Sequence, residues 1–208
     1  MMVISKTFEI NFSHITRNCY SERCKYSLHA HTAKIEVFIE GNKIDNAGMI
    51  LDYTILKKVI KPFIDIHDNT VLIWKYDNEE YKNIIKSKTD NWIELFFNPT
   101  SELLAAYFQL HFDTILKRVK LKNNEDKELS IIKTRFYETR TGWAEANNYD
   151  VLKLVTDEKQ VLMMGKVGNL VLDKMKKFED NIGASFFGDK PIELEKPEIQ
   201  VILRKKIK

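Results

Sequence analysis

Two stretches near the start of the chain alternate apolar and polar residues, which is the pattern of strands with one buried face. The first runs from Thr7 to His14, and the second runs from His29 to Ile39. The apolar rows contain Phe8, Ile10, Phe12 and His14 in the first strand, and His29, His31, Ala33, Ile35, Val37 and Ile39 in the second. The polar segment 16–27 between them contains both cysteines, and it predicts a loop.

Apolar residues recur at helical spacing in three later segments. The first spans residues 51–63, and Pro62 should end or kink this helix near Lys61 because proline lacks a backbone N–H. The second follows Asn98, since segment 98–102 has the capping, proline and acidic residues of a helix start. The third spans residues 169–178.

The other parts of the chain give weaker patterns. Residues 129–138 alternate and predict a strand, which follows a polar turn at 122–127. The charged segment 74–98 has few periodic cues, and it indicates a short strand, an insertion and a return. The order strand, strand, helix, helix, strand predicts an α+β fold with a largely antiparallel sheet.

The length of 208 residues suits one domain, or one domain with an appendage. The character of the sequence changes after Asn147, so we divide the chain into a domain at 1–147 and a C-terminal extension at 148–208. A final apolar run at 199–203 favours packing of this extension rather than disorder. No motif gives the extension a role.

The composition, with 44% apolar and 30% charged residues, is that of a soluble globular protein. A net charge of +3 gives no strong cationic field, so composition does not indicate a nucleic-acid partner. No window approaches about 18 consecutive apolar residues and the first residues lack a signal-peptide pattern, so we expect neither a membrane span nor export. One disulfide between two cysteines could not stabilise a domain of this size, which favours reduced thiols and a cytoplasmic location.

Three histidines, His14, His29 and His31, lie on the apolar rows of the first two strands. An antiparallel pair would bring the end of one strand beside the start of the next, and residues two apart on a strand point the same way. Three neutral imidazoles would leave one position of a tetrahedral zinc ion open for water or substrate. The alternative is a set of ordinary strand histidines, since a His-X-His pair alone is a weak signal.

Five short motifs follow one another along the chain. They are Phe12-Ser13-His14, Cys24-Lys25-Tyr26-Ser27-Leu28-His29-Ala30-His31, Ala47-Gly48-Met49-Ile50-Leu51-Asp52-Tyr53, Pro99-Thr100-Ser101-Glu102 and Tyr137-Glu138-Thr139-Arg140-Thr141-Gly142-Trp143-Ala144. With this set, residues 5–147 resemble the family of 6-pyruvoyl-tetrahydropterin synthases and 6-carboxy-5,6,7,8-tetrahydropterin synthases. The resemblance implies a tunnelling fold, in which a four-stranded antiparallel sheet with two helices on one face assembles as a homo-oligomer, usually a hexamer of two trimers.

The resemblance also implies a catalytic centre. His14, His29 and His31 match the zinc ligands of the family, and Cys24 matches its catalytic cysteine. The zinc would bind and acidify the side-chain hydroxyl groups of the substrate. Cys24 would act as a thiolate base, so that the zinc and the thiolate together labilise a carbon-bound proton.

A second group of matches lies in the segments that bind the pterin. Glu138 matches the glutamate that anchors the pterin ring, because an ionised carboxylate can accept two adjacent N–H groups. Thr100, Ser101 and Glu102 fall in the pterin-pocket segment of the family. The alternative for Glu138 alone is a surface or salt-bridged glutamate.

The chain departs from the family pattern at two positions. Ala30 replaces the glycine of His-Gly-His, and its side chain should point away from the histidines. Asp68 matches the aspartate of a catalytic Asp-His pair, but Asn69 stands at the histidine position, and asparagine cannot transfer protons at neutral pH. Either a shifted backbone lets His67 take the role of the missing histidine, or this half of the acid–base machinery is weakened.

The resemblance therefore predicts a zinc-dependent carbon–carbon lyase of the 6-carboxytetrahydropterin synthase type. Such an enzyme converts 7,8-dihydroneopterin triphosphate to 6-carboxytetrahydropterin, acetaldehyde and triphosphate, on the route to queuosine and other 7-deazaguanines. One alternative is a 6-pyruvoyl-tetrahydropterin synthase. The other is a non-catalytic pterin-binding or metal-binding paralogue, which the asparagine at position 69 favours.

Overall fold

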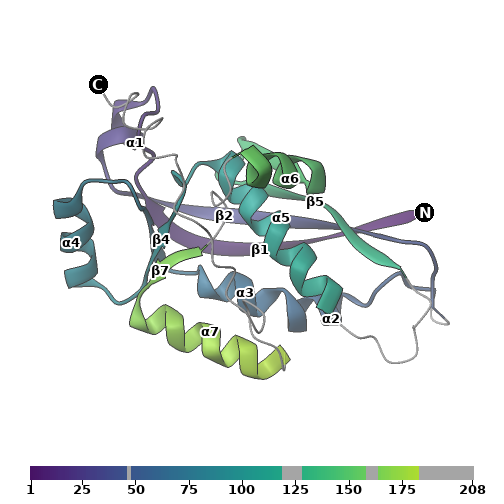
Figure 1. Cartoon of the computed structure of the whole chain (residues 1–208). Helices are drawn as coiled ribbons and strands as arrows, with labels where there is room; N and C mark the ends of the chain where they lie inside the picture. The colour runs from purple at the N-terminus through teal and green to yellow at the C-terminus, as the bar shows by residue number, and fades with distance from the viewer. Residues whose placement is uncertain (46–47, 119–127, 158–163, 183–208) are drawn as a thin grey trace.

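One mixed sheet of seven strands forms the centre of the protein in a computed structural model, which describes residues 1–45, 48–118, 128–157 and 164–182 (Figure 1). The strand order is β6-β5-β2-β1-β3-β4-β7. The strands are β1 (Met2–His14), β2 (His29–Gly41), β3 (Thr70–Trp74), β4 (Trp92–Leu95), β5 (Leu129–Tyr137), β6 (Trp143–Asn147) and β7 (Met164–Val167). The helices are α1 (Glu22–Tyr26), α2 (Tyr53–Val59), α3 (Lys61–Ile66), α4 (Glu79–Lys88), α5 (Ser101–Arg118), α6 (Asn148–Asp157) and α7 (Asn169–Ile182).

The two long strands β1 and β2 pair antiparallel over their whole length, and this pairing places His14 directly opposite His29. Strands β5 and β6 continue this antiparallel half of the sheet. The prediction of a four-stranded sheet is wrong, because the sheet is larger. Strands β3 and β4 continue it beyond β1 as parallel strands, and β7 is the last strand at that edge. Both β3 and β4 are almost fully buried, so their sequences lack the alternation that marks a strand with one wet face.

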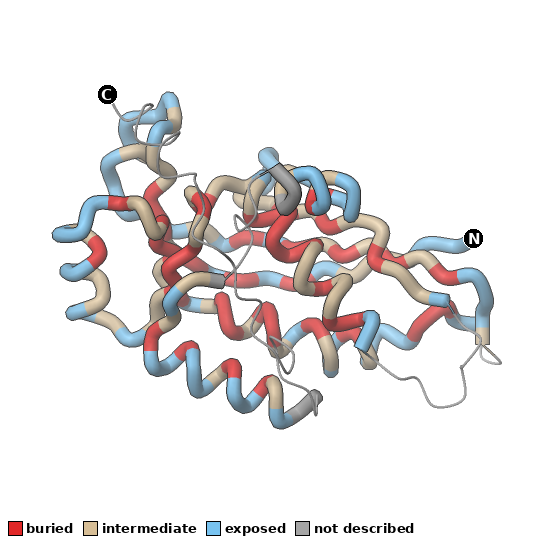
Figure 2. The backbone as a smooth tube through the Cα atoms, in the orientation of Figure 1, coloured by how far each residue is buried: buried red, intermediate tan, exposed pale blue. Residues whose placement is uncertain are grey.

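Helices cover one face of the antiparallel half of the sheet. On β1, Phe8 and Ile10 are buried under this layer, whereas Glu9 and Asn11 on the opposite face are exposed. Helix α5 packs on β5 and β6, and α3 packs on β1. Figure 2 shows the buried segments along the middle of the sheet and on the helix sides that face it. The core therefore lies between this face and α2, α3 and α5.

The helical segment at 51–63 is kinked, as its proline predicts. Helix α2 ends at Val59, α3 begins at Lys61, and Ile60 joins them. Pro62 lies in the first turn of α3, where a helix does not need its missing N–H.

The described part of the C-terminal extension packs onto the rest of the chain. Strand β7 pairs with β4, and a Cβ atom on Gly165 would lie only 1.8 Å from the carbonyl oxygen of Glu94. Glycine is therefore required at this close approach of two backbones. Helix α7 packs against α3, where the ring centroid of Phe178 lies 6.4 Å from that of Phe63.

Two segments without a predicted helix contain one. Segment 16–27 includes the single-turn helix α1, which Ser21 caps by accepting from the backbone N–H of Cys24. Segment 74–98 contains α4 and β4, so the predicted insertion is a helical crossover between the parallel strands β3 and β4. The predicted turn at 122–127 and the apolar run at 199–203 lie outside the described residues. Within the described residues, none of the helices has the length and apolar character needed to cross a membrane.

Candidate metal and substrate site

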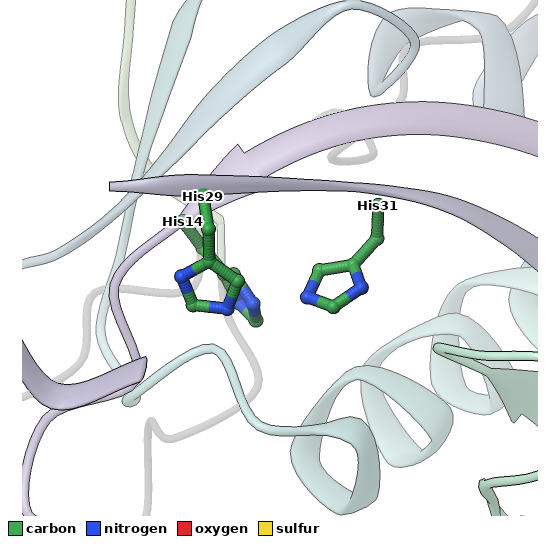
Figure 3. A group of neighbouring side chains, drawn as sticks. All are labelled: His14, His29 and His31. Atoms are coloured by element: carbon green, nitrogen blue, oxygen red, sulfur yellow. The ribbon is translucent and has the colours of Figure 1, made fainter. Parts of the chain in front are cut away.

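Three histidine rings converge where β1 ends and β2 begins. His14 and His29 face each other across the ladder, and His31 follows on the same side of β2 (Figure 3). The ring centroids of His14 and His29 are 4.7 Å apart, and that of His31 lies 5.0 Å from each. One nitrogen from each ring lies within 4.8 Å of the other two. The antiparallel register thus assembles the cluster that the alternating pattern predicts.

Backbone carbonyl groups hold the three rings in one tautomer. The Nδ1 atoms of His14 and His29 lie 2.8 Å and 2.9 Å from the carbonyl oxygens of Pro99 and Ser27. The backbone of Glu138 hydrogen-bonds the ring of His31, whose Nε2 has no partner, so the bonded atom is Nδ1. In each ring Nδ1 can then carry the hydrogen and leave the Nε2 lone pair free. Metal-ligating histidines are oriented in this way by carbonyl groups.

Two of these Nε2 atoms are buried without a hydrogen-bond partner, those of His14 and His31. A buried polar atom without a partner is costly, and a metal ion would satisfy both atoms at once. Burial lowers the pKa of His14 to about 4, and it also lowers the pKa of His31. Both rings are therefore neutral at pH 7, as ligation requires. The residues present fit a divalent metal that prefers nitrogen ligands.

The carboxylate of Glu138 lies beside this cluster. Glu138 follows directly after β5, and its Oε1 lies 3.6 Å from Nε2 of His14. Since His14 is neutral, we regard this contact as proximity rather than as an ion pair. The side chain of Glu138 is 26% exposed, so a ligand can reach it. The structure therefore brings the predicted pterin anchor to the predicted metal ligands.

The predicted pterin-pocket segment begins α5 next to the same cluster. The Thr100 hydroxyl accepts from the backbone N–H of Leu103, and the Thr100 carbonyl accepts from Leu104, as in a helix start. Ser101 is half-buried and Glu102 is exposed in the first turn. The bond between Pro99 and His14 ties this turn to the histidines.

Cys24 lies in α1, five residues before His29 in the sequence. It is a half-buried free thiol, and its carbonyl oxygen accepts from the backbone N–H of Thr16 at 3.0 Å. Cys19 is also free, and its Sγ lies 3.3 Å from the carbonyl oxygen of Ser21. Cys24 is therefore positioned by the loop that joins the two histidine-bearing strands.

His67 is a core residue that is 1% exposed. Its Nδ1 donates to the Phe63 carbonyl at 3.0 Å, and its Nε2 accepts from the Tyr107 hydroxyl at 2.9 Å. Burial lowers its pKa to about 4, against the opposing effect of the Phe63 bond and with a smaller contribution from Lys174. Both ring nitrogens are engaged within the core, which favours a structural role over proton transfer.

Asp68 is held at the edge of β1. Its Oδ1 accepts from the backbone N–H of Asn11 at 2.7 Å, and its Oδ2 accepts from the side chain of Asn69 at 3.1 Å. Asn69 has a φ of 56°, a left-handed conformation that asparagine tolerates. The side chain of Asn11, which also donates to Oδ1 of Asp68 at 3.4 Å, lies on the face of β1 opposite to that of His14. Asp68 is thus bound on the other side of the sheet from the histidine cluster.

A separate hollow of about 690 Å³ lies along the free edge of β1. Its lining comes from β1, β2, α2, α3 and Tyr137, and it includes none of the three histidines. Four lysines line it, namely Lys6, Lys34, Lys57 and Lys61. This hollow is distinct from the histidine site.

Sequence reasoning missed the backbone groups and the arginine that build the site. The carbonyl of Pro99 orients His14, and Arg17 connects the Cys24 loop to Asp77. Backbone carbonyl groups carry no sequence signal, and the arginine and aspartate are 60 residues apart. Only the fold brings them together.

Comparisons with known proteins find relatives of this chain. The sequence profile described as 6-pyruvoyl tetrahydropterin synthase matches residues 3–148. A 6-carboxy-5,6,7,8-tetrahydropterin synthase of Helicobacter pylori is 34% identical over 145 residues, which cover 70% of this chain and 72% of that protein. A protein of the same name from Rickettsia typhi is 27% identical over 127 residues, which cover 61% of this chain and 86% of that protein. The structure of an uncharacterised protein from Wolinella succinogenes shares the fold, with a TM-score of 0.54 at 15% identity over 71% of this chain and 98% of that chain.

Proposed function

Because this chain belongs to the 6-pyruvoyl tetrahydropterin synthase family, we propose that it is a zinc-dependent 6-carboxy-5,6,7,8-tetrahydropterin synthase. In this reaction 7,8-dihydroneopterin triphosphate is converted to 6-carboxytetrahydropterin, acetaldehyde and triphosphate. Relatives that carry this name support the choice of product. The proposal rests above all on one observation, the carboxylate of Glu138 beside three histidines with converging nitrogens.

His14, His29 and His31 would hold the zinc ion through their Nε2 atoms. Three imidazoles are a common ligand set for catalytic zinc, since they leave one position for a substrate oxygen. Zinc bound there would supply Lewis acidity to the side-chain hydroxyl groups of the substrate. The carbonyl groups of Pro99 and Ser27 keep two of the rings in the ligating tautomer.

Glu138 would accept two N–H groups from the aminopyrimidinone edge of the pterin. A bidentate carboxylate fixes the orientation of a planar ring as well as its affinity. Thr100, Ser101 and Glu102 would line the same pocket from the start of α5, which the contact between Pro99 and His14 places beside the cluster. Recognition of the ring would thus come from β5 and α5, next to the metal ligands from β1 and β2.

Cys24 would take the carbon-bound proton as a thiolate, with Asp68 as the second acid–base group. A single copy does not bring these two residues to one site, since Asp68 is bound by the Asn11 side chain on the face opposite to the histidines. We therefore propose that a second copy of the chain supplies Asp68. His67 is not part of this machinery in our proposal, because its ring is enclosed in the core.

Free sheet edges support a homo-oligomer, which we propose to be a hexamer of two trimers. Within the described residues, β1 pairs with no strand on its outer side from Met2 to Ile10, and β6 pairs only with β5. Strands β1 and β6 run in opposite directions, because three antiparallel pairings separate them. The β6 strand of one copy can therefore extend the sheet of the next at β1, which would remove both exposed edges.

We propose that the enzyme is cytoplasmic and that its partner is this small-molecule pterin, without a nucleic-acid or membrane partner. Its product would supply the queuosine pathway. The two free thiols suit a reducing compartment.

One specific observation favours a second candidate, a pterin or metal binder without turnover. Asn69 stands where the family has histidine, and its side chain donates to Asp68 instead of relaying a proton.

Analysis of products tests the proposal. The zinc-loaded protein is incubated with 7,8-dihydroneopterin triphosphate, and the pterins are separated and identified by mass. We expect 6-carboxytetrahydropterin. A 6-pyruvoyl pterin would assign the other activity of the family, and unchanged substrate with measurable pterin binding would assign the binder.

A further inference from the structure

The helix that carries Cys24 is held by two residues that follow β1. Helix α1 has five residues, which is too short to satisfy its own last carbonyl groups. The backbone N–H of Thr16 donates to the Cys24 carbonyl at 3.0 Å, and Nη1 of Arg17 donates to the Lys25 carbonyl at 2.9 Å. The position of Cys24 therefore depends on where Arg17 is held.

Arg17 is fixed by a carboxylate from the crossover between β3 and β4. Its Nε lies 2.9 Å and 3.0 Å from the two carboxylate oxygens of Asp77, and its Nη2 lies 2.9 Å from Oδ1. The Asp77 side chain is only 4% exposed, and the guanidinium also lies over the ring of Tyr81 at 5.4 Å. A bidentate pair in this setting fixes direction as well as charge.

The backbone of Arg17 makes a third connection. Its N–H donates to Oδ1 of Asn98 at 3.1 Å, and its carbonyl accepts from Nδ2 of Asn98 at 2.6 Å. Asn98 precedes Pro99, whose carbonyl orients the ring of His14. One residue thus links the Cys24 helix, the α4 crossover and the segment that orients a metal ligand.

We propose that Arg17, held by Asp77, is a positioning residue that sets the place of the Cys24 thiol relative to the histidine cluster. This inference rests on the proposed role of Cys24 as the catalytic base. A buried ion pair is weak support for stability, because desolvation offsets the attraction between the charges. Its geometric value is greater, since Arg17 joins Asp77 and Lys25 through different nitrogens of one planar group, and the single nitrogen of a lysine does not reproduce that geometry. The charged crossover at 74–98 thereby supports the site.

The test uses the full-length, zinc-loaded protein with Cys19→Ser, so that Cys24 is the only thiol. Alkylation of Cys24 by iodoacetamide is followed against pH in the parent, Arg17→Met, Arg17→Lys, Asp77→Asn and the double variant Arg17→Met/Asp77→Asn. Zinc content, the thermal midpoint, kcat and KM are measured on the same samples. Lys117→Met, which removes an exposed ion pair on α5, serves as the matched control.

We expect Arg17→Met to raise the limiting rate of alkylation at least about threefold, because the loosened helix exposes the thiol more often. It should lower kcat about tenfold or more at an almost unchanged KM, with zinc retained, since misplacement of a catalytic group is costly. Arg17→Lys should give an alkylation rate and a kcat between those of the parent and Arg17→Met. The double variant should match Arg17→Met, because the two residues act as one unit. Lys117→Met should behave as the parent.

Alkylation of Arg17→Met or Arg17→Lys at the parent rate would overturn the inference, whatever happens to kcat. Effects of Arg17→Met and Asp77→Asn that simply multiply in the double variant would overturn it as well. A parent without turnover would remove the proposed lyase activity, but the alkylation series would still decide whether Arg17 positions the thiol. The two failures are therefore distinguishable.

Discussion

The Nδ1 atom of His14 lies 2.8 Å from the carbonyl oxygen of Pro99, 85 residues further along the chain. This bond joins the end of β1 to the turn that begins α5. It connects a predicted metal ligand with the segment predicted to bind the pterin. The metal site and the substrate site are thus parts of one structure, and the predictions below separate their contributions.

Replacement of His29 and His31 by alanine should remove the metal. The parent should bind one zinc ion per chain, and the double variant should keep less than about a tenth of it, because one imidazole cannot form a zinc site. Metal analysis of the dialysed proteins measures this. Cys24→Ala is the control and should retain the metal, since the cluster of the described residues consists of three histidines. Zinc content of the double variant equal to that of the parent would contradict the ligand assignment.

Glu138→Ala should weaken pterin binding without loss of zinc. Removal of a bidentate carboxylate leaves the N–H groups of the pterin unpaired, at a cost of about 2–4 kcal/mol, or roughly 30- to 700-fold in the dissociation constant. Titration with 7,8-dihydroneopterin measures the affinity. Glu9→Ala changes an exposed glutamate of β1 and should bind as the parent does. An affinity of Glu138→Ala within twofold of the parent would show that the pterin is anchored elsewhere.

His67 should make folding stability depend on pH. Its pKa is about 4 in the folded protein and about 6.5 in the unfolded chain, so the unfolded chain takes up the proton first as the pH falls. The contribution of the neutral ring to the free energy of unfolding is fully present above pH 6.5 and is lost progressively down to about pH 4. Between pH 7 and pH 5 this loss amounts to about 2 kcal/mol.

Comparison with His67→Leu isolates this contribution, because leucine does not titrate. Urea unfolding of both metal-free proteins at several pH values gives the difference in their free energies of unfolding. The advantage of the parent at pH 7 should shrink toward pH 5. A difference that stays constant across this range would mean that the ring can be protonated in place. His67→Leu should keep turnover within about threefold wherever it remains folded, unlike loss of a general acid or base, which costs about 100-fold or more.

Phe178→Ala tests whether the C-terminal extension is part of the folding unit. Phe178 is 1% exposed and packs against Phe63, so its truncation should cost about 3–5 kcal/mol in the free energy of unfolding. Leu172→Ala on the same helix removes a side chain that is 49% exposed and should cost less than about 0.5 kcal/mol. Equal and small effects of the two changes would indicate that α7 is dispensable. The division of the chain at residue 147 stays a prediction until then.

The histidine cluster could be predicted from the sequence because alternation determines the face of each strand residue. The rows from Phe8 to His14 and from His29 to Ile39 are one-sided, and the antiparallel register follows from burying both rows on the same helices. The start of α5 was readable for a similar local reason, since Pro99 and Thr100 carry the chemistry of a helix beginning.

Other parts of the structure depend on contacts that no local pattern reveals. Strands β3 and β4 are buried on both faces and short, so they lack a period that could identify them. Helix α4 is polar, and its buried Lys82 bonds the carbonyl of Lys75, which no propensity predicts. His67 follows a short helix and is enclosed by the packing of Phe63, Tyr107 and Phe108. Its sequence context fits a catalytic loop equally well.

The release of acetaldehyde tests the central claim most directly. The zinc-loaded protein is mixed with 7,8-dihydroneopterin triphosphate, and acetaldehyde and triphosphate are measured over time beside the same reaction with Glu138→Ala and Cys24→Ala. The account predicts that the parent releases the two products in equal amounts over many turnovers, and that both variants release far less. Triphosphate release without acetaldehyde, or no release from a protein that holds one zinc per chain, would contradict it.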